Sequence, residues 1–100
     1  MSLALNDEHR QIVRRIVAAH LPAGANVRVF GSRAKGAPRP HSDLDLAFET
    51  SEGLTQAELA NLAEAFSESD LPFKVDIVDL HSASPTLRAA IDRDGIDLNP

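Results

Sequence analysis

Residues 26–49 read NVRVFGSRAKGAPRPHSDLDLAFE, and this stretch decides the fold because it holds two strands joined by a connection rich in glycine and proline. Its first five residues alternate and include β-branched side chains, which predicts a short strand over 26–30. Strict alternation over 43–49 predicts a second strand, with its leucines and phenylalanine on one face and its two aspartates on the other. A short helical turn is predicted over 32–35, and prolines exclude regular structure over 37–42.

Caps and apolar periodicity indicate three further helices. The first covers 7–20 and is capped by Asn6, the second begins with a capping box of Thr55 and Glu58, and the last is capped by Ser84. The predicted inward-facing residues of the second and last helices are Leu59, Leu62, Ala63, Phe66, Leu87, Ala90 and Ile91.

A third strand is predicted over 73–80, where FKVDIVDL is rich in β-formers. The element order over residues 1–100 is then α-β-α-β-α-β-α. This order predicts a single α/β (α+β) domain with a small three-stranded, mixed sheet covered by helices.

Composition and charge narrow the class of protein. The chain has 43% apolar residues, no cysteine and a net charge of −5. It lacks an apolar run of membrane-spanning length and a signal-like N-terminus, so no membrane association is expected and a reducing cytoplasm is the predicted location. The acidic balance argues against a protein that grips long nucleic acid over its whole surface.

The basic residues gather where the acidic ones are missing. Residues 28–41 carry four bases and no acid, whereas all but two of the fifteen acids follow from Asp43 onward. A local cationic pocket on an acidic body suits a small anionic ligand, with a solvated basic loop as the alternative. The glycine spacing of 31–36 resembles a P-loop, but Ala37 and Pro38 stand where Lys-Ser/Thr is required.

Asp43 and Asp45 lie on one face of the second predicted strand, about 7 Å apart along the chain. Such a pair favours Mg²⁺, which binds one or two carboxylates together with substrate phosphates; an exposed polar strand face is the alternative. A third acid is available on the neighbouring strand, at Asp76 or Asp79. Three acids on two strands are suited to holding two metal ions for phosphoryl transfer.

Taken together, the Gly-Ser turn, the DLDL segment and the downstream VDIVDL segment resemble the nucleotidyltransferase superfamily that includes DNA polymerase β and the kanamycin nucleotidyltransferase. The chain is most similar to the smallest branch, the minimal nucleotidyltransferases. The resemblance spans roughly residues 5–98 and includes an I-x-x-x-G segment at 91–95.

The resemblance implies two groups of site residues. Asp76 is preferred to Asp79 because it lies in the middle of its strand. The implied nucleotide- or phosphate-binding residues are Gly31, Ser32, Arg33, Lys35 and Ser42, and the implied catalytic and metal-binding residues are Asp43, Asp45 and Asp76.

The resemblance also implies an activity and partners. It predicts transfer of NMP, AMP from ATP being expected, to an acceptor hydroxyl with the aid of two Mg²⁺ ions, for which Mn²⁺ is an alternative. The acceptor surface is expected from another protein or from a second copy of the chain. A HEPN-type toxin with an acceptor tyrosine is the expected partner, which makes this chain an antitoxin. A nucleotide- and partner-binding module without turnover and a metal-binding structural domain are the alternatives.

Overall fold

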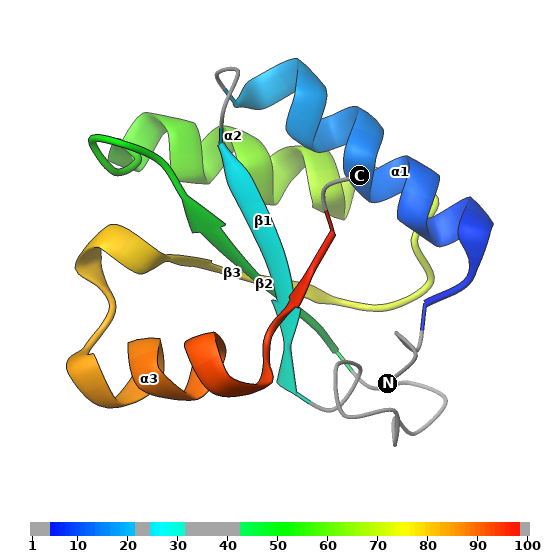
Figure 1. Cartoon of the computed structure of the whole chain (residues 1–100). Coiled ribbons are helices and arrows are strands. Elements are labelled where there is room, and N and C mark those ends of the chain that lie inside the picture. Colours follow the sequence, from blue (N-terminus) through cyan, green and yellow to red (C-terminus); the bar gives the residue numbers. More distant parts are fainter. Residues whose placement is uncertain (1–4, 22–24, 32–42, 99–100) are drawn as a thin grey trace.

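The computed structural model describes residues 5–21, 25–31 and 43–98, and Figure 1 shows how the elements are arranged. In chain order these elements are α1 (Asp7–His20), β1 (Asn26–Phe30), β2 (Leu44–Glu49), α2 (Gln56–Ser67), β3 (Val75–Asp79), the 3-10 turn η2 (Leu80–Ser82), α3 (Pro85–Asp94) and β4 (Ile96–Asp97). None of the helices in these described ranges has the length and apolar character needed to cross a membrane.

The predictions for the two ends of the first helix and first strand are confirmed, since α1 and β1 have the predicted limits. The helical turn predicted over 32–35 and the irregular connection predicted over 37–42 lie outside the described residues. The second and third strands are shorter than predicted. Asp43 precedes β2, and β3 ends at Asp79, whose side chain caps the turn η2.

The strands form one mixed sheet in the order β3-β2-β1-β4. β1 pairs antiparallel with β2 and with β4, whereas β2 and β3 are parallel. The predicted mixed character is confirmed, but the predicted count of three strands is wrong. The fourth strand has two residues after Gly95, too few to show an alternating pattern. The parallel pair requires a crossover, which α2 supplies.

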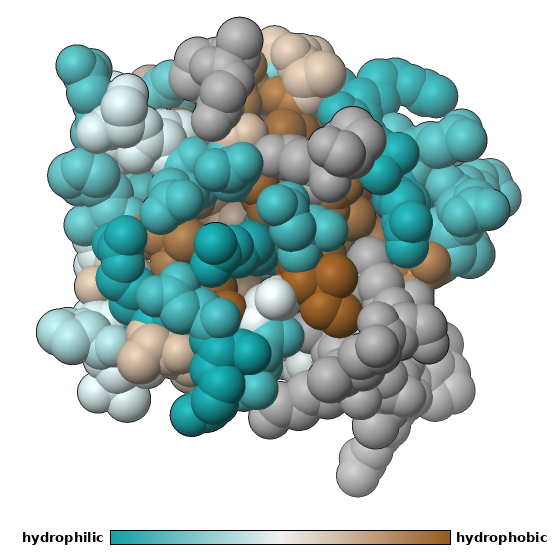
Figure 2. Space-filling view, in the orientation of Figure 1, coloured by the Kyte–Doolittle hydropathy of each residue, from teal (hydrophilic) through white to brown (hydrophobic). Residues whose placement is uncertain are grey.

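Helices cover both faces of this sheet. Figure 1 shows α1 and α2 on one side of the strands and α3 on the other. In the same orientation, Figure 2 shows hydrophilic residues over most of this face of the molecule, with apolar residues visible between them. The charged surface of the helices therefore faces water while their apolar stripes face the strands.

β2 is the most buried strand, as its central position requires. Leu44, Leu46 and Phe48 are 0% exposed and belong to the main core, to which α1 and α2 contribute. Ala47 points the opposite way and packs in a second cluster with residues of η2 and α3. Each large side chain buried here contributes about 1.5–3 kcal/mol, so the backbone of β2 is held firmly from both faces.

The predicted helix starts are confirmed by their hydrogen bonds. Asn6 Oδ1 accepts from the His9 N–H at 2.8 Å, and Ser84 caps α3. The capping box of α2 is closed in both directions between Thr55 and Glu58. These caps satisfy amide groups that have no partner within the helix.

The buried stripe of α2 is narrower than predicted. Leu62 and Phe66 are buried, but Leu59 is half-buried and Ala63 is exposed. Because each residue advances about 100° around a helix, a face centred between Leu62 and Phe66 leaves Ala63 at its border. The side of α2 that carries Ala63 is therefore open to solvent.

Candidate active site

The parallel pairing of β2 and β3 brings acidic residues from two strands together. Its register makes Asp45 and Asp76 direct partners, and Asp43 lies two residues before Asp45, at the entry to β2. Asp79 pairs with Phe48, three residues further along, and so lies away from the pair. The register thus assembles an acidic site from Asp43, Asp45 and Asp76.

The three carboxylates affect one another electrostatically. The pKa of Asp45 is raised from its ordinary value of 3.8, first by burial and then by the negative charges of Asp76 and Asp43. Both causes disfavour the charged form of Asp45. A cation bound among these carboxylates would relieve the repulsion.

Lys74 lies beside the acidic site. Its Nζ is 3.7 Å from Asp76 Oδ1, and the two side chains are 73% and 46% exposed, so the ion pair is weak. Sequence analysis did not assign a role to Lys74. Its spacing of two residues from Asp76 was the available signal, because residues i and i+2 share a strand face.

Gly31 bounds the acidic site on the β1 side. Its φ is +75°, a conformation that side chains rarely adopt, and a Cβ atom placed on it would overlap the Asp45 carboxylate. The absence of a side chain therefore lets the carboxylate lie against the backbone at the start of the predicted phosphate-binding turn. The other predicted phosphate-binding residues, Ser32, Arg33, Lys35 and Ser42, lie outside the described residues.

The aspartates offer the right donors for a metal but do not form a closed metal centre. In the described part of the chain, no group of three or more His, Cys, Asp or Glu side chains is gathered closely enough to hold an ion. The donor chemistry nevertheless fits a divalent cation, since hard carboxylate oxygens with an excess of negative charge are the ligands that Mg²⁺ prefers. Among the described residues the acidic site therefore supplies carboxylate donors and one neighbouring base, Lys74.

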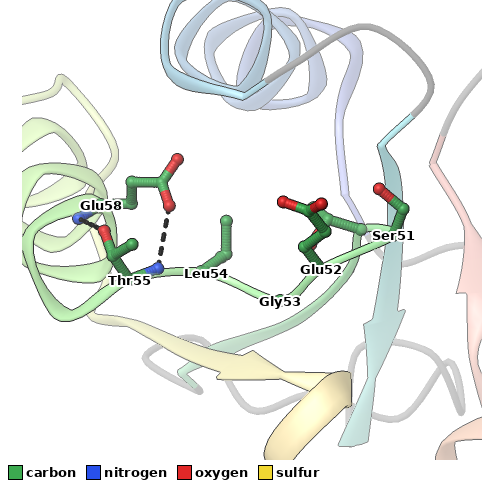
Figure 3. Close-up of a pocket in the computed structure, with 7 residues that line it drawn as sticks. Ser51, Glu52, Gly53, Leu54, Thr55 and Glu58 are labelled. Atoms are coloured by element: carbon green, nitrogen blue, oxygen red, sulfur yellow. Dashed lines mark hydrogen bonds between the residues drawn. The ribbon is translucent and has the colours of Figure 1, made fainter.

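A second hollow lies at the opposite end of β2 and does not belong to this site. It has a volume of about 490 Å³ and is lined by residues 50–55 and by Glu58. Figure 3 shows Glu58 and Thr55 joined by the hydrogen bonds of the capping box. The polar groups of these two residues already stabilise the start of α2, so we assign the hollow no ligand.

Asp79 stabilises the loop beside this second hollow. It is 8% exposed, and its carboxylate accepts from the Leu54 N–H at 2.9 Å and the His81 N–H at 3.0 Å. Asp79 is the last residue of β3, and its side chain caps η2. Two backbone donors compensate for burying this charge.

A mixed sheet covered by helices, with Gly31 directly after β1 and aspartates on two adjacent strands, is the arrangement expected of a nucleotidyltransferase. Residues 15–99 match the family model described as "Polymerase beta, Nucleotidyltransferase", and the chain belongs to this family. The predicted resemblance and fold class are confirmed. Members of this family generally use divalent metal ions.

Individual relatives are closely similar over most of the chain. One is "Probable protein adenylyltransferase MntA" of Haemophilus influenzae, which is 42% identical over 89 residues, or 89% of this chain and 77% of the relative. A chain of a crystal structure described as a toxin-antitoxin with AMP-PNP has a TM-score of 0.79 and 28% identity, covering 90% of this chain and 72% of that one. A chain of a structure of a tri-AMPylated Shewanella oneidensis HEPN toxin in complex with an MNT antitoxin has a TM-score of 0.72 and 26% identity, covering 90% and 68%.

Proposed function

We propose that this chain is a protein adenylyltransferase that transfers AMP from ATP to a hydroxyl group of a HEPN-type toxin and thereby acts as its antitoxin. The observation that carries the proposal is the register that sets Asp45 beside Asp76, with Asp43 two residues away. The relatives support the choice of substrates, since their names specify a protein adenylyltransferase and an AMPylated HEPN toxin in complex with an MNT antitoxin.

The reaction joins the acceptor oxygen to the α-phosphorus of ATP. The bond between this phosphorus and the bridging oxygen of the β-phosphate breaks, and pyrophosphate leaves. The proton of the acceptor hydroxyl needs a base, and Asp76 is our candidate because it lies at the outer strand of the sheet. Gly31 lets the Asp45 carboxylate lie against the chain directly after β1, where the phosphate-binding turn is expected to begin.

The metal ions are assigned to the same carboxylates. We infer that Asp43, Asp45 and Asp76 hold Mg²⁺, two ions being expected and Mn²⁺ being an alternative. Bound divalent ions would neutralise the charge on the phosphates and stabilise the entering and leaving oxygens. The pKa of Asp45 is raised first by burial and then by the charges of Asp76 and Asp43, and a divalent cation bound there would offset the repulsion between these charges.

The predicted phosphate ligands complete the proposed site. Ser32, Arg33, Lys35 and Ser42 are expected to bind the triphosphate together with Gly31, through hydroxyl groups and positive charge. A tyrosine of the toxin is the expected acceptor, because a phenolic oxygen is a group to which AMP is readily ester-linked.

Intact-mass measurement of the partner tests the proposal. The chain is incubated with a candidate HEPN partner, ATP and Mg²⁺, and the partner is expected to gain the mass of AMP. The double variant Asp43→Asn with Asp45→Asn should transfer none. Glu52→Gln, an exposed carboxylate on the β2–α2 loop, is the matched control and should transfer as the wild type does.

The outcomes separate the candidate functions. Transfer by the Asp43→Asn/Asp45→Asn variant would refute the assignment of the catalytic carboxylates. A wild-type chain that binds both AMP-PNP and the partner but transfers nothing would instead be a nucleotide- and partner-binding module without turnover.

A further inference from the structure

The third carboxylate of the acidic site belongs to the outer strand of the sheet. β3 has a strand neighbour, β2, on one side only among the described residues. Its first four residues, Val75 to Val78, are all half-buried, whereas four of the six residues of β2 are buried. An outer strand presents alternate backbone N–H and C=O groups to whatever approaches it.

The order of the site residues across the sheet gives the active site two different sides. Gly31 follows β1, Asp45 lies on β2 and Asp76 lies on β3. The proposed phosphate turn is on the β1 side, where β1 and β4 continue the sheet. An acceptor group therefore reaches Asp76 most directly from the open β3 side.

A hollow lies at the same strand, on the side of α2. Its volume is about 310 Å³, and its apolar wall comes from Phe66, Leu71, Phe73 and Val75. Exposed Ala63 of α2 also lines it. A protein interface commonly takes most of its affinity from a few apolar side chains seated in such hollows.

Lys74 connects the hollow to the acidic site. It lines the hollow, and its Nζ is 3.7 Å from Asp76 Oδ1. Val75, which lines the hollow, and Asp76 face opposite sides of the sheet, so Lys74 and the outer edge of β3 lie between the hollow and the carboxylate proposed to meet the acceptor. A partner seated along this edge could fill the hollow and present a hydroxyl group to Asp76 at the same time.

We propose that the outer edge of β3, together with this hollow, is the docking surface for the acceptor protein, which seats an apolar side chain in the hollow. This inference rests on the proposed function for the identity of the partner. It adds the direction from which the acceptor enters and the part of the chain that it contacts. Asp45 and Asp76 lie on the face of the sheet that carries α3, whereas the hollow lies on the α2 side, so the docking surface extends over both faces at the edge of β3 (Figure 1).

The experiment compares two arginine substitutions on the same helix. Ala63→Arg fills the hollow, while Ala60→Arg places the same side chain at another exposed alanine of α2 that does not line it. The dissociation constant of the complex with the candidate HEPN partner is measured by calorimetry for the wild type and both variants. Ala63→Arg should raise it about tenfold or more, as expected for loss of an anchoring contact, and Ala60→Arg should change it less than about threefold.

Two further measurements keep the result interpretable. AMP-PNP binding by Ala63→Arg should match that of the wild type, since the substitution lies outside the nucleotide site. Hydrogen exchange of the wild-type complex should show new protection in the peptide covering 75–79. This second readout does not depend on the folding of any variant.

The inference is overturned if 75–79 gains no protection, or if Ala63→Arg and Ala60→Arg weaken the complex equally or not at all. It is also overturned if the wild-type chain forms a dimer that Ala63→Arg disrupts, because a second copy would then occupy the surface. A complex that forms as described but transfers no AMP would refute the proposed activity and leave the docking surface intact.

Discussion

A methyl group at Gly31 should damage the acidic site, and a second glycine provides a matched control. Gly31 and Gly53 have φ values of +75° and +80°, so Gly31→Ala and Gly53→Ala impose nearly the same backbone strain. The new Cβ at position 31 would overlap the Asp45 carboxylate. At position 53 the new Cβ would come to 3.2 Å from Cβ and Cγ of exposed His81 and to 3.3 Å from Asp79 Oδ2, which are tight contacts but not an overlap like that at position 31.

The expected magnitudes follow from this difference. An ordinary residue in the left-handed region costs about 1–2 kcal/mol, and both variants should lose this much. Gly31→Ala should lose about 1–3 kcal/mol more, the usual cost of overpacking, because Asp45 is displaced while Asp43 and Asp76 repel it. A loss of about 1 kcal/mol lowers the melting temperature of a domain of this size by about 4–8 °C. The melting temperature of Gly31→Ala should therefore lie clearly below that of Gly53→Ala.

Urea unfolding at pH 7 without metal gives the stabilities, and the intact mass of the partner gives AMP transfer. Gly53→Ala should transfer AMP like the wild type once both are folded, whereas Gly31→Ala should transfer little or none. Equal stability losses in the two variants, with transfer retained by Gly31→Ala, would refute the placement of the Asp45 carboxylate against Gly31.

Three further changes should have measurable effects. Asp79→Asn should lower the free energy of unfolding by about 1–3 kcal/mol, because an amide cannot accept from both Leu54 and His81; an unchanged urea midpoint would contradict this. Thr55→Ala should cost about 1 kcal/mol in the same assay through loss of the α2 cap, and a loss below about 0.3 kcal/mol would show that the cap contributes little. The raised pKa of Asp45 means that the folded state binds its proton more tightly than the unfolded chain does. Without metal, the stability of the wild type relative to Asp45→Asn should therefore fall as the pH rises from 3.8 through that pKa. Urea unfolding of both proteins across this pH range measures the difference, and a flat or opposite trend would contradict the prediction.

Local features of the fold could be predicted from the sequence. The caps at Asn6, Thr55 and Ser84 depend on neighbours within a few residues, and each forms the predicted contact. The alternation in β2 likewise fixed which residues enter the core, because each face of a strand repeats every second residue. These predictions needed no knowledge of how distant segments pair.

Features that depend on distant pairing could not be derived in the same way. The alternating pattern predicted which face of its strand Asp76 lies on, but it did not predict that Asp76 pairs with Asp45. The register of two parallel strands depends on how the crossover packs, which the local sequence does not show. β4 was missed because only its pairing with β1 makes two residues a strand. The ion pair of Lys74 with Asp76 and the open border of α2 at Ala63 also became visible only with the elements in place.

The parallel pairing of β2 with β3 has a consequence for folding. A chain in which only β1 and β2 have paired already holds Asp45 beside Gly31, but it lacks Asp76, because α2 must first carry the chain across the sheet. Closing a long segment of chain before its contacts form slows this step relative to hairpin formation. The acidic site is therefore completed by a contact that is less local than the pairing of β1 with β2. Partly folded chains should contain two of the three carboxylates and no activity, so AMP transfer would measure the fully folded fraction more strictly than helix content does.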